Sequence, residues 1–369
     1  MEDKLIVIAT ETYASAQILQ TYLESNGIEA YLQHENLVQP MVSEGVQVQI
    51  KESDVEKAVK LLTEKHPKEH PAKLHIPRKI LVPIDFSTPS QNAARFALHL
   101  ASKYGSEIKL LHVFNSPMVD MIPFTDAASI QIDIDISYNM LRKNAKEKLL
   151  KFYNDLKSFA KELKLDNIKI GYSLVEGYAA YGIIEMSSRY KPGIIVMGTK
   201  GDGYRSTELV GSVATEVSDE TRLPLLVIPE AAVMKGVDEV KNVLYTTNFD
   251  ACDFQAIRKL ISIASPFKVN LFCLHVSDES DIAMQQAKMN SLKTYFNEVN
   301  PKLNVECTLI QGKDIVKTFK SYISEKNINL VALTVLKRNL IYKMLNPSIT
   351  KKMLYQSDVP VLLFHAEPI

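Results

Sequence analysis

Residues 78–230 and 231–369 carry the same succession of apolar segments, so the chain contains an internal repeat. Segments early in each copy align at an offset of 163 residues, and later segments align at 135 or 136. Two copies of one pattern predict two copies of one domain, each with its own core. The aligned segments are 80–87 (ILVPIDFS) with 243–250 (VLYTTNFD), 110–113 (LLHV) with 273–276 (CLHV), 175–177 (VEG) with 310–312 (IQG), 195–198 (IVMG) with 331–334 (VALT), and 222–224 (RLP) with 358–360 (DVP).

Each copy alternates short apolar segments with amphipathic ones. Strands that are apolar on both faces are typical of parallel sheets covered by helices. We therefore predict an α/β fold with two tandem doubly wound domains, each a five-stranded parallel sheet with the Rossmann-like strand order 3-2-1-4-5. The strands are expected near 79–84, 107–113, 168–175, 193–198 and 224–229 in the first copy, and near 242–247, 268–276, 303–310, 328–334 and 360–364 in the second.

Residues 1–66 follow a different pattern, in the order strand, helix, strand, strand, helix. This order is most of a ferredoxin-like unit, so we expect a small α+β ferredoxin-like domain. Residues 67–77 contain three prolines and no periodicity, which predicts a linker. By its pattern and by the segment SNGIEAYL at 25–32, the N-terminal segment resembles a small signal-transducing domain found beside other modules in bacterial proteins.

The N-terminal segment is acidic. It holds eleven Asp and Glu, five Lys and no Arg, a net charge of −6. Binding of an oligonucleotide to this segment is therefore not expected. Two interpretations stay open: the segment docks a protein partner, or its acidic face only meets solvent.

The whole chain carries 43 Lys plus Arg and 43 Asp plus Glu, a formal net charge of zero. It has no field of one sign to attract nucleic acid or an anionic membrane. Its three cysteines form no CxxC pair, and it contains no apolar run of the roughly 18 residues that a membrane span needs. We expect a cytoplasmic protein that binds neither nucleic acid nor membrane and has no metal site of its own.

A glycine-rich segment follows the fourth strand of the first copy. Glycines let backbone N–H groups approach an anion closely, and a helix beginning at Ser212 would offer unpaired N–H donors and the positive end of its dipole. The segment therefore predicts a phosphate-binding loop between Gly198 and Ser212. In open α/β sheets the ligand lies beyond the carboxyl ends of the strands, where the strand order reverses. Asp85, which follows the first strand, is expected to share that crevice, and Val113 is available there for apolar packing.

These residues resemble the universal stress protein family, whose nucleotide-binding members carry the pattern G-x2-G-x9-G-[ST]. Gly198, Gly201, Gly211 and Ser212 match it without a gap, and ILVPIDFSTPS, LLHV and RLPLLVIP support the same assignment. The resemblance covers about 290 residues as two tandem copies. It implies that the first copy binds ATP with a divalent metal, Mg²⁺ or Mn²⁺. The implied nucleotide-binding residues are Pro83, Ile84, Asp85, Val113, Met197, Gly198, Lys200, Gly201, Gly211, Ser212, Val213 and Ala214.

The second copy departs from this pattern at each of these key positions. Thr334, Lys337, Pro347 and Ser348 stand where the first copy has Gly198, Gly201, Gly211 and Ser212, and Asn248 replaces Asp85. Because proline has no N–H to donate, we predict one nucleotide per chain, bound by the first copy. The apolar last strands, 223–228 and 359–364, predict pairing between the two copies or with a second chain, since exposed apolar edges aggregate.

The resulting hypothesis is an ATP-binding universal stress protein that acts as a nucleotide-responsive stress regulator or protective protein. The chain lacks the patterns GxxxxGK[ST], GxGxxG, GxSxG and HExxH, and His112 and His275 are expected to be sheet-end residues rather than catalysts. Fast ATP hydrolysis is therefore not indicated. The alternatives are an interaction scaffold without nucleotide, and a slow ATPase or autophosphorylating protein that uses Ser206, Thr207 or Ser212.

Overall fold

The computed structural model divides the chain into two compact units, Met1–Lys73 with His275–Lys313 and Leu74–Leu274 with Asp314–Ile369. The domain boundaries inferred from the sequence stay a prediction. The structure describes residues 5–11, 13–34, 46–64, 77–115, 127–199, 212–232, 239–247, 249, 252–277, 282–300, 303–312, 314–335 and 359–365.

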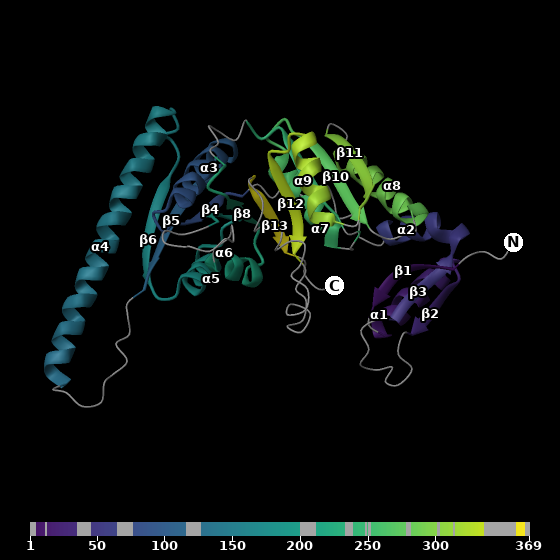
Figure 1. Ribbon diagram of the computed structural model, residues 1–369, viewed down its shortest axis with the longest axis horizontal. Helices are drawn as coiled ribbons and strands as arrows, with labels where there is room; N and C mark the ends of the chain where they lie inside the picture. Colours follow the sequence, from purple (N-terminus) through teal and green to yellow (C-terminus); the bar gives the residue numbers. More distant parts are fainter. Residues whose placement is uncertain are drawn as a thin grey trace. The chain divides into compact units, whose positions relative to one another are not determined.

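The first repeat forms five parallel strands in the order β8-β7-β4-β5-β6. The second repeat has the order β11-β10-β9-β12-β13. Numbered within each repeat, both orders are 3-2-1-4-5, so the predicted α/β fold is confirmed (Figure 1). The strands are β4 (Lys79–Pro83), β5 (Glu107–Phe114), β6 (Ile170–Glu176), β7 (Ile194–Gly198) and β8 (Leu225–Ile228), then β9 (Asn242–Thr246), β10 (Asn270–Ser277), β11 (Asn304–Gln311), β12 (Leu330–Val335) and β13 (Val361–His365).

The helices of the first repeat cover both faces of its strands. Alternate residues of a strand face opposite sides, and in β5 the ring of His112 lies on the side of α4 while Val113 packs against α5. The cores of β4, β7 and β8 are fully buried between these layers, as expected for strands without polar alternation. The helices are α3 (Thr88–Tyr104), α4 (Ala127–Glu162), α5 (Ala179–Tyr190) and α6 (Ser212–Glu220), and in the second repeat α7 (Cys252–Ala264), α8 (Ile282–Val299) and α9 (Ile315–Glu325).

Local sequence explains where α3 begins and ends. Ser87 caps its N-terminus by accepting a hydrogen bond from the N–H of Ser90, and Pro89 lies in the first turn, where its missing N–H costs nothing. Gly105 ends the helix in the left-handed conformation, with φ of 66°. The start of α3 is therefore fixed directly after β4, at the carboxyl edge of the sheet.

The two repeats are joined through their last strands. β13 pairs with β8 in antiparallel orientation, and Leu226 lies opposite Leu362, its equivalent 136 residues later. Tyr104 and Phe267, which are also equivalent positions, meet with ring centroids 5.8 Å apart. Contact between equivalent residues is the signature of a two-fold axis. The two repeats thus pair within one chain as two identical subunits would, and the predicted pairing of the last strands is confirmed.

His365 adds a polar contact across this junction. It ends β13, and its Nε2 lies 2.6 Å from the carbonyl oxygen of Ser218 while its Nδ1 lies 3.2 Å from that of Leu223. The Ser218 carbonyl belongs to the last turn of α6, which has no intrahelical partner to offer it. The second repeat therefore caps a helix of the first. Burial of the imidazole lowers the pKa of His365.

The N-terminal part forms a three-stranded antiparallel sheet in the order β1-β3-β2. Its core gathers eleven buried residues from the strands and both helices, including Leu23, Ile28 and Ile50. The predicted βαββα order is confirmed, while the ferredoxin-like assignment stays a prediction. The elements are β1 (Leu5–Glu11), α1 (Tyr13–Ser25), β2 (Ala30–His34), β3 (Val46–Lys51), a 3₁₀ turn (Glu52–Asp54) and α2 (Val55–Glu64).

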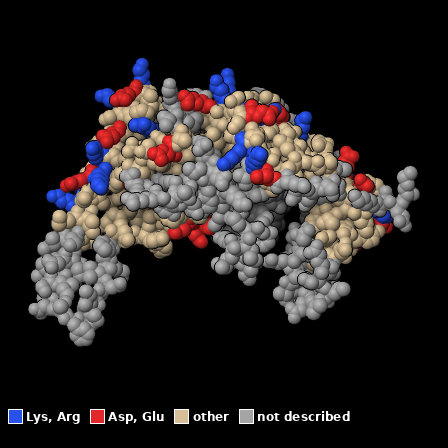
Figure 2. Space-filling view, viewed as in Figure 1, with Lys and Arg blue, Asp and Glu red and all other residues tan. Residues whose placement is uncertain are grey.

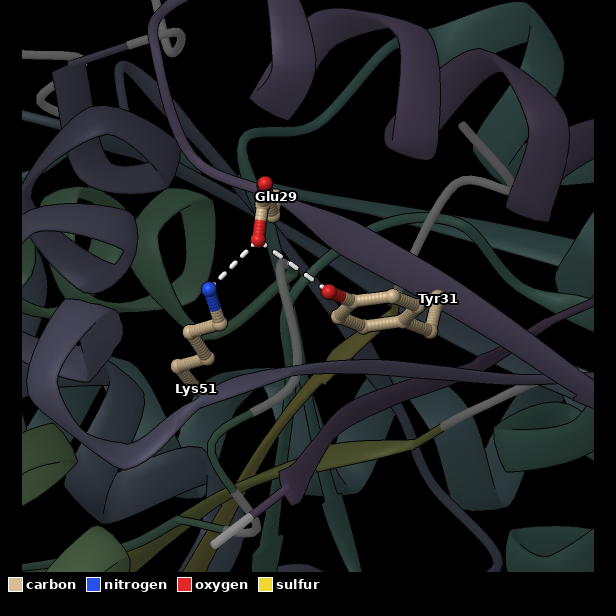
Figure 3. Close-up of polar contacts among 3 residues, drawn as sticks. All are labelled: Glu29, Tyr31 and Lys51. Atoms are coloured by element: carbon tan, nitrogen blue, oxygen red, sulfur yellow. Dashed lines mark hydrogen bonds and ion pairs between the residues drawn. The ribbon is translucent and has the colours of Figure 1, made fainter. Parts of the chain in front are cut away.

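Helix α8 belongs to the same compact unit as this sheet. It packs against α2, and Ala287 of α8 lies against the N-terminal core. At the surface of the sheet, Lys51 Nζ lies 2.5 Å from Glu29 Oε2, and the hydroxyl of Tyr31 donates to the same oxygen at 3.1 Å (Figure 3). The hydrogen bond from Lys51 is the main cause that lowers the pKa of Glu29. Exposed ion pairs of this kind add little stability.

We predict that Leu226→Ala lowers the free energy of unfolding by about 2–5 kcal/mol, because it leaves a cavity at the centre of the junction. Leu226 is 2% exposed. The measurement is urea denaturation followed by circular dichroism. Tyr181→Ala is the matched control, because this side chain is 70% exposed and its loss should change stability by at most about 0.5 kcal/mol. Equal effects of the two substitutions would contradict the importance of the junction.

Candidate functional site

The candidate site lies at the carboxyl edge of the first repeat. β4 and β7 are parallel neighbours, with Ile80 opposite Ile194 and Leu81 opposite Ile195. The strand order reverses between them, because β5 and β6 continue on one side of β4 and β7 and β8 on the other. The residues that follow β4 and β7, among them Asp85 and Thr199, therefore emerge at the same edge, at the position where ligands bind in open α/β sheets.

The structure describes nine of the twelve residues predicted for this site. Pro83, Ile84, Met197 and Ala214 are buried, Val113, Gly198 and Val213 are half-buried, and Asp85 and Ser212 are exposed. Lys200, Gly201 and Gly211 lie outside the described residues. In the second repeat Thr334 is described, whereas Asn248, Lys337, Pro347 and Ser348 are outside the described residues.

Gly198 is required by the close approach of α3. A Cβ atom at this position would lie 2.7 Å from the carbonyl carbon of Pro89 and 2.8 Å from the backbone nitrogen of Ser90. Both are backbone atoms at the start of a helix, so they cannot move aside cheaply. The glycine therefore lets the end of β7 pass directly beneath the first turn of α3. The predicted phosphate loop starts from this contact.

Asp85 is held by the turn between β4 and α3. Its Oδ1 accepts hydrogen bonds from the N–H of Ser87 at 3.1 Å and from the hydroxyl of Ser87 at 2.5 Å. The side chain itself is exposed. One carboxylate oxygen accepts both hydrogen bonds, and this orients the group at the sheet edge.

The same turn contains a costly backbone angle. Phe86 has φ of 72°, in the left-handed region that a bulky residue rarely adopts, at a cost of about 1–3 kcal/mol. Phe249, its equivalent in the second repeat, has φ of 61°. Since both repeats keep this angle, it is a property of the repeated fold, and neighbouring contacts must offset its cost.

His112 supplies such contacts. The sequence predicts only that this histidine lies at the end of a strand. Its Nδ1 lies 2.8 Å from the carbonyl oxygen of Ile84, and its ring is 4.3 Å from that of Phe86. Burial is the main cause that lowers the pKa of His112. The neutral imidazole therefore donates from Nδ1 to Ile84. The repeated LLHV and CLHV segments were the only sequence signal for this histidine.

Val113 lies against α5. A Cβ atom at Gly182 would come within 2.9 Å of Cγ2 of Val113, so the glycine allows α5 to sit closely on this side chain. Tyr178, the residue before α5, donates from its hydroxyl to Glu216 of α6 at 3.4 Å. These contacts connect the carboxyl ends of β5 and β6 with α6. Neither Tyr178 nor Glu216 was predicted for the site.

Ser212 is the first residue of α6, as the sequence predicted. The first N–H groups of a helix have no intrahelical acceptor, and its dipole places positive charge at this end. A segment that starts at the carboxyl end of a strand and finishes at a helix N-terminus is the context in which proteins bind phosphate. The local geometry suits an anionic ligand.

The second repeat holds a buried hydrogen-bond network at the equivalent place. The hydroxyl of Tyr245 donates to Asp253 Oδ1 at 2.7 Å and lies 3.0 Å from Oγ1 of Thr334, while Thr247 donates to Asp253 Oδ2. Tyr245, Asp253 and Thr247 are at most 3% exposed. Burial, followed by the charge of Asp253, raises the pKa of Tyr245. Thr334 and Asp253 of this network stand at the positions of Gly198 and Ser90 in the first repeat.

Within the part of the chain that the structure describes, no cluster of three or more His, Cys, Asp or Glu could hold a metal ion. Among the same residues, no helix combines the length and the apolar character needed to cross a membrane. Figure 2 shows basic and acidic side chains interspersed over the face in view, in agreement with a net charge of zero.

Comparisons with known proteins identify the first repeat. The model of the universal stress protein family matches residues 77–229. A universal stress protein of Methanocaldococcus jannaschii is 30% identical over 151 residues, which are 41% of this chain and 81% of that protein. The universal stress protein YxiE of Bacillus subtilis is 26% identical over 150 residues, 41% of this chain and 97% of its own. This chain belongs to the universal stress protein family.

A solved structure shows the same fold over a longer part of the chain. The crystal structure of a universal stress protein from Archaeoglobus fulgidus has a TM-score of 0.59 and 18% sequence identity, and the likeness covers 79% of this chain and 97% of that one. Because the family model matches only residues 77–229, this likeness in fold extends beyond the first repeat.

We predict that Gly198→Ala destabilises the protein by about 1–3 kcal/mol, because the added methyl group overlaps the backbone of α3. The free energy of unfolding is again measured in urea. The matched control is Gly171→Ala in β6, where a Cβ would meet the nearest atom, the carbonyl oxygen of Ile108, at 3.9 Å. That control should be tolerated. If both variants are equally stable, the close approach at Gly198 does not matter.

We also predict that Tyr245→Phe costs about 1–3 kcal/mol, because the buried carboxylate of Asp253 loses a hydroxyl donor. Chemical denaturation measures the change. Tyr31→Phe removes a hydroxyl that also donates to a carboxylate, but at the surface, and should change stability much less. If the hydrogen bonds around Asp253 do not stabilise the protein, the two variants will lose the same small amount of stability.

Proposed function

We propose that this chain is an ATP-binding universal stress protein that binds one ATP in its first repeat and acts as a nucleotide-responsive regulator or protective protein. The observation that carries the proposal is the setting of the G-x2-G-x9-G-S segment. It begins at Gly198, the last residue of β7 beside β4, and its serine is the first residue of α6. Such a segment is suited to a polyphosphate.

We propose a separate role for each part of the site. Asp85, oriented by Ser87, would bind the ribose or the base, and Val113 would pack against adenine. The Ser212 hydroxyl and the first N–H groups of α6, with Val213 and Ala214, would bind phosphate oxygens. The loop glycines and Lys200 would complete the phosphate contacts. When bound, ATP would order the segment 198–214 and change the neighbouring surface for a partner.

A divalent ion, Mg²⁺ or Mn²⁺, fits this site only together with the nucleotide. Mg²⁺ is usually held by phosphate oxygens and one or two carboxylates rather than by a full set of protein ligands. Asp202 and Glu208 lie in the loop sequence and would repel the phosphates unless they face solvent, bind the metal ion or are offset by Lys200 and Arg205.

The second repeat is proposed to be a degenerate universal stress protein domain that binds no nucleotide. Its internal network of Tyr245, Asp253 and Thr334 supports this role, because Thr334 stands at the position of Gly198. The length of the fold likeness to the Archaeoglobus fulgidus structure supports the tandem arrangement. The acidic N-terminal segment, proposed as a ferredoxin-like domain, would dock a protein partner.

Isothermal titration with ATP and Mg²⁺ tests the proposal. We expect one site per chain and a rise in the apparent melting temperature with ATP, because the ligand binds the folded form. Ser212→Ala should weaken binding about tenfold or more, since it removes a hydrogen bond to a charged phosphate.

The matched control is Ser348→Ala, at the equivalent position of the second repeat, which should leave the affinity for ATP unchanged. Two sites per chain would contradict the assignment of the second repeat. Failure of millimolar ATP to bind or to stabilise the protein would overturn the proposal in favour of a scaffold without nucleotide.

A further inference from the structure

We propose that His112 is a positioning residue for the nucleoside end of the site: it holds the turn that presents Asp85, without contacting Asp85 itself. The inference rests on the proposed function, because it takes Asp85 as a ligand-binding group. Its geometry involves only described residues of the first repeat.

The first part of the geometry is the double attachment of Ile84 to β5. The N–H of Ile84 donates to the carbonyl oxygen of Leu111 at 2.8 Å, and its carbonyl oxygen lies 2.8 Å from Nδ1 of His112. Ile84 is 5% exposed, so both backbone groups need partners inside the protein. The sheet ladder supplies one partner and the histidine side chain supplies the other. Asp85 is the next residue along the chain.

The second part is the packing on the other side of Asp85. The ring of His112 lies 4.3 Å from that of Phe86, which also meets Phe152 of α4 edge-on at 6.1 Å. Phe86 is the residue with the left-handed backbone angle. His112 thus binds the residue before Asp85 and contacts the residue after it. Loss of the imidazole would remove the contact with the Ile84 carbonyl and the ring contact with Phe86, while the hydrogen bond from the Ile84 N–H to Leu111 would remain.

The protonation of His112 suits this role. Burial favours the neutral ring, and of the charges facing it, Asp85 favours the cation while Lys148 of α4 opposes it. A neutral imidazole has a single N–H, and the Ile84 carbonyl requires it at Nδ1. The hydrogen bond persists if Nε2 gains a proton, so the attachment of Ile84 to His112 does not depend on pH.

The second repeat secures the same turn differently. The N–H of Phe249 donates to Oγ1 of Thr247 at 2.9 Å, and Thr247 is itself bound to the buried Asp253. Thr247 is the equivalent of Ile84, which has no hydroxyl to offer. In the first repeat the hydrogen bonds within the turn run from the N–H and the hydroxyl of Ser87 to Asp85. His112 adds the contact with the Ile84 carbonyl, which holds the residue before Asp85.

The test compares two substitutions. His112→Asn keeps an N–H donor at the place of Nδ1, whereas His112→Leu removes it at similar volume. We expect His112→Leu to weaken the binding of adenosine and of ATP by the same factor, about three- to tenfold. The affinities of His112→Asn should stay within about twofold of those of the wild type. Tripolyphosphate should bind all three proteins equally, because it lacks the nucleoside. Melting temperatures identify any variant that fails to fold.

A double-mutant cycle separates positioning from general damage. In an Asp85→Ala background, His112→Leu should cause no further loss of adenosine affinity. An additive loss, wild-type affinity in His112→Leu, or failure of His112→Asn to restore binding would overturn the proposal.

Amide hydrogen exchange of residues 84–87 in the free protein provides a measurement without nucleotide. We expect faster exchange in His112→Leu and wild-type exchange in His112→Asn. Equal exchange in all three proteins would overturn the proposal that His112 holds the turn. A different result would separate the two proposals: the wild type binds neither adenosine nor ATP, and only His112→Leu exchanges faster. The proposed function would then fail, while the role of His112 in holding the turn would be supported.

Discussion

The antiparallel pairing of β8 with β13 is the contact on which the architecture of the repeats depends. The last strand of each repeat is apolar and would leave a row of unpaired backbone groups at an open edge. Pairing them buries Leu226 against Leu362 and satisfies both edges within the chain. Because β8 runs parallel to β7, β13 runs parallel to β12, and β8 and β13 are antiparallel, the carboxyl ends of these strands face opposite ways in the two repeats.

That arrangement explains how the repeats have diverged without loss of the fold. The positions that make the junction are equivalent in the two copies, as the contact between Tyr104 and Phe267 shows. The carboxyl edges lie away from each other, so one can change without strain on the other. The first edge has Gly198 beneath a helix start, where a side chain would not fit. The second has Thr334 in a network around a buried carboxylate.

The strained turn after the first strand of each repeat shows the same principle on a smaller scale. Phe86 and Phe249 both adopt a left-handed backbone angle. In the first repeat His112 of the neighbouring strand contacts the turn, and in the second Thr247, within the turn, accepts a hydrogen bond from the N–H of Phe249. The two repeats thus keep one backbone shape with unequal side chains, since Thr247 stands at the position of Ile84.

The repeated apolar segments predicted the order of strands and helices, because parallel strands covered on both faces alternate with helices in doubly wound folds. The strand order 3-2-1-4-5 was the Rossmann-like choice within that class. The start of α6 at Ser212 also followed from local sequence. The contact of His112 with Ile84, the bond between Tyr178 and Glu216, and the network around Asp253 did not. Each joins residues that are distant along the chain or hidden in an apolar pattern, and only the approach of packed elements brings them together. The packing of α8 on α2 is of the same kind, because an amphipathic face shows that a helix is covered but not by what.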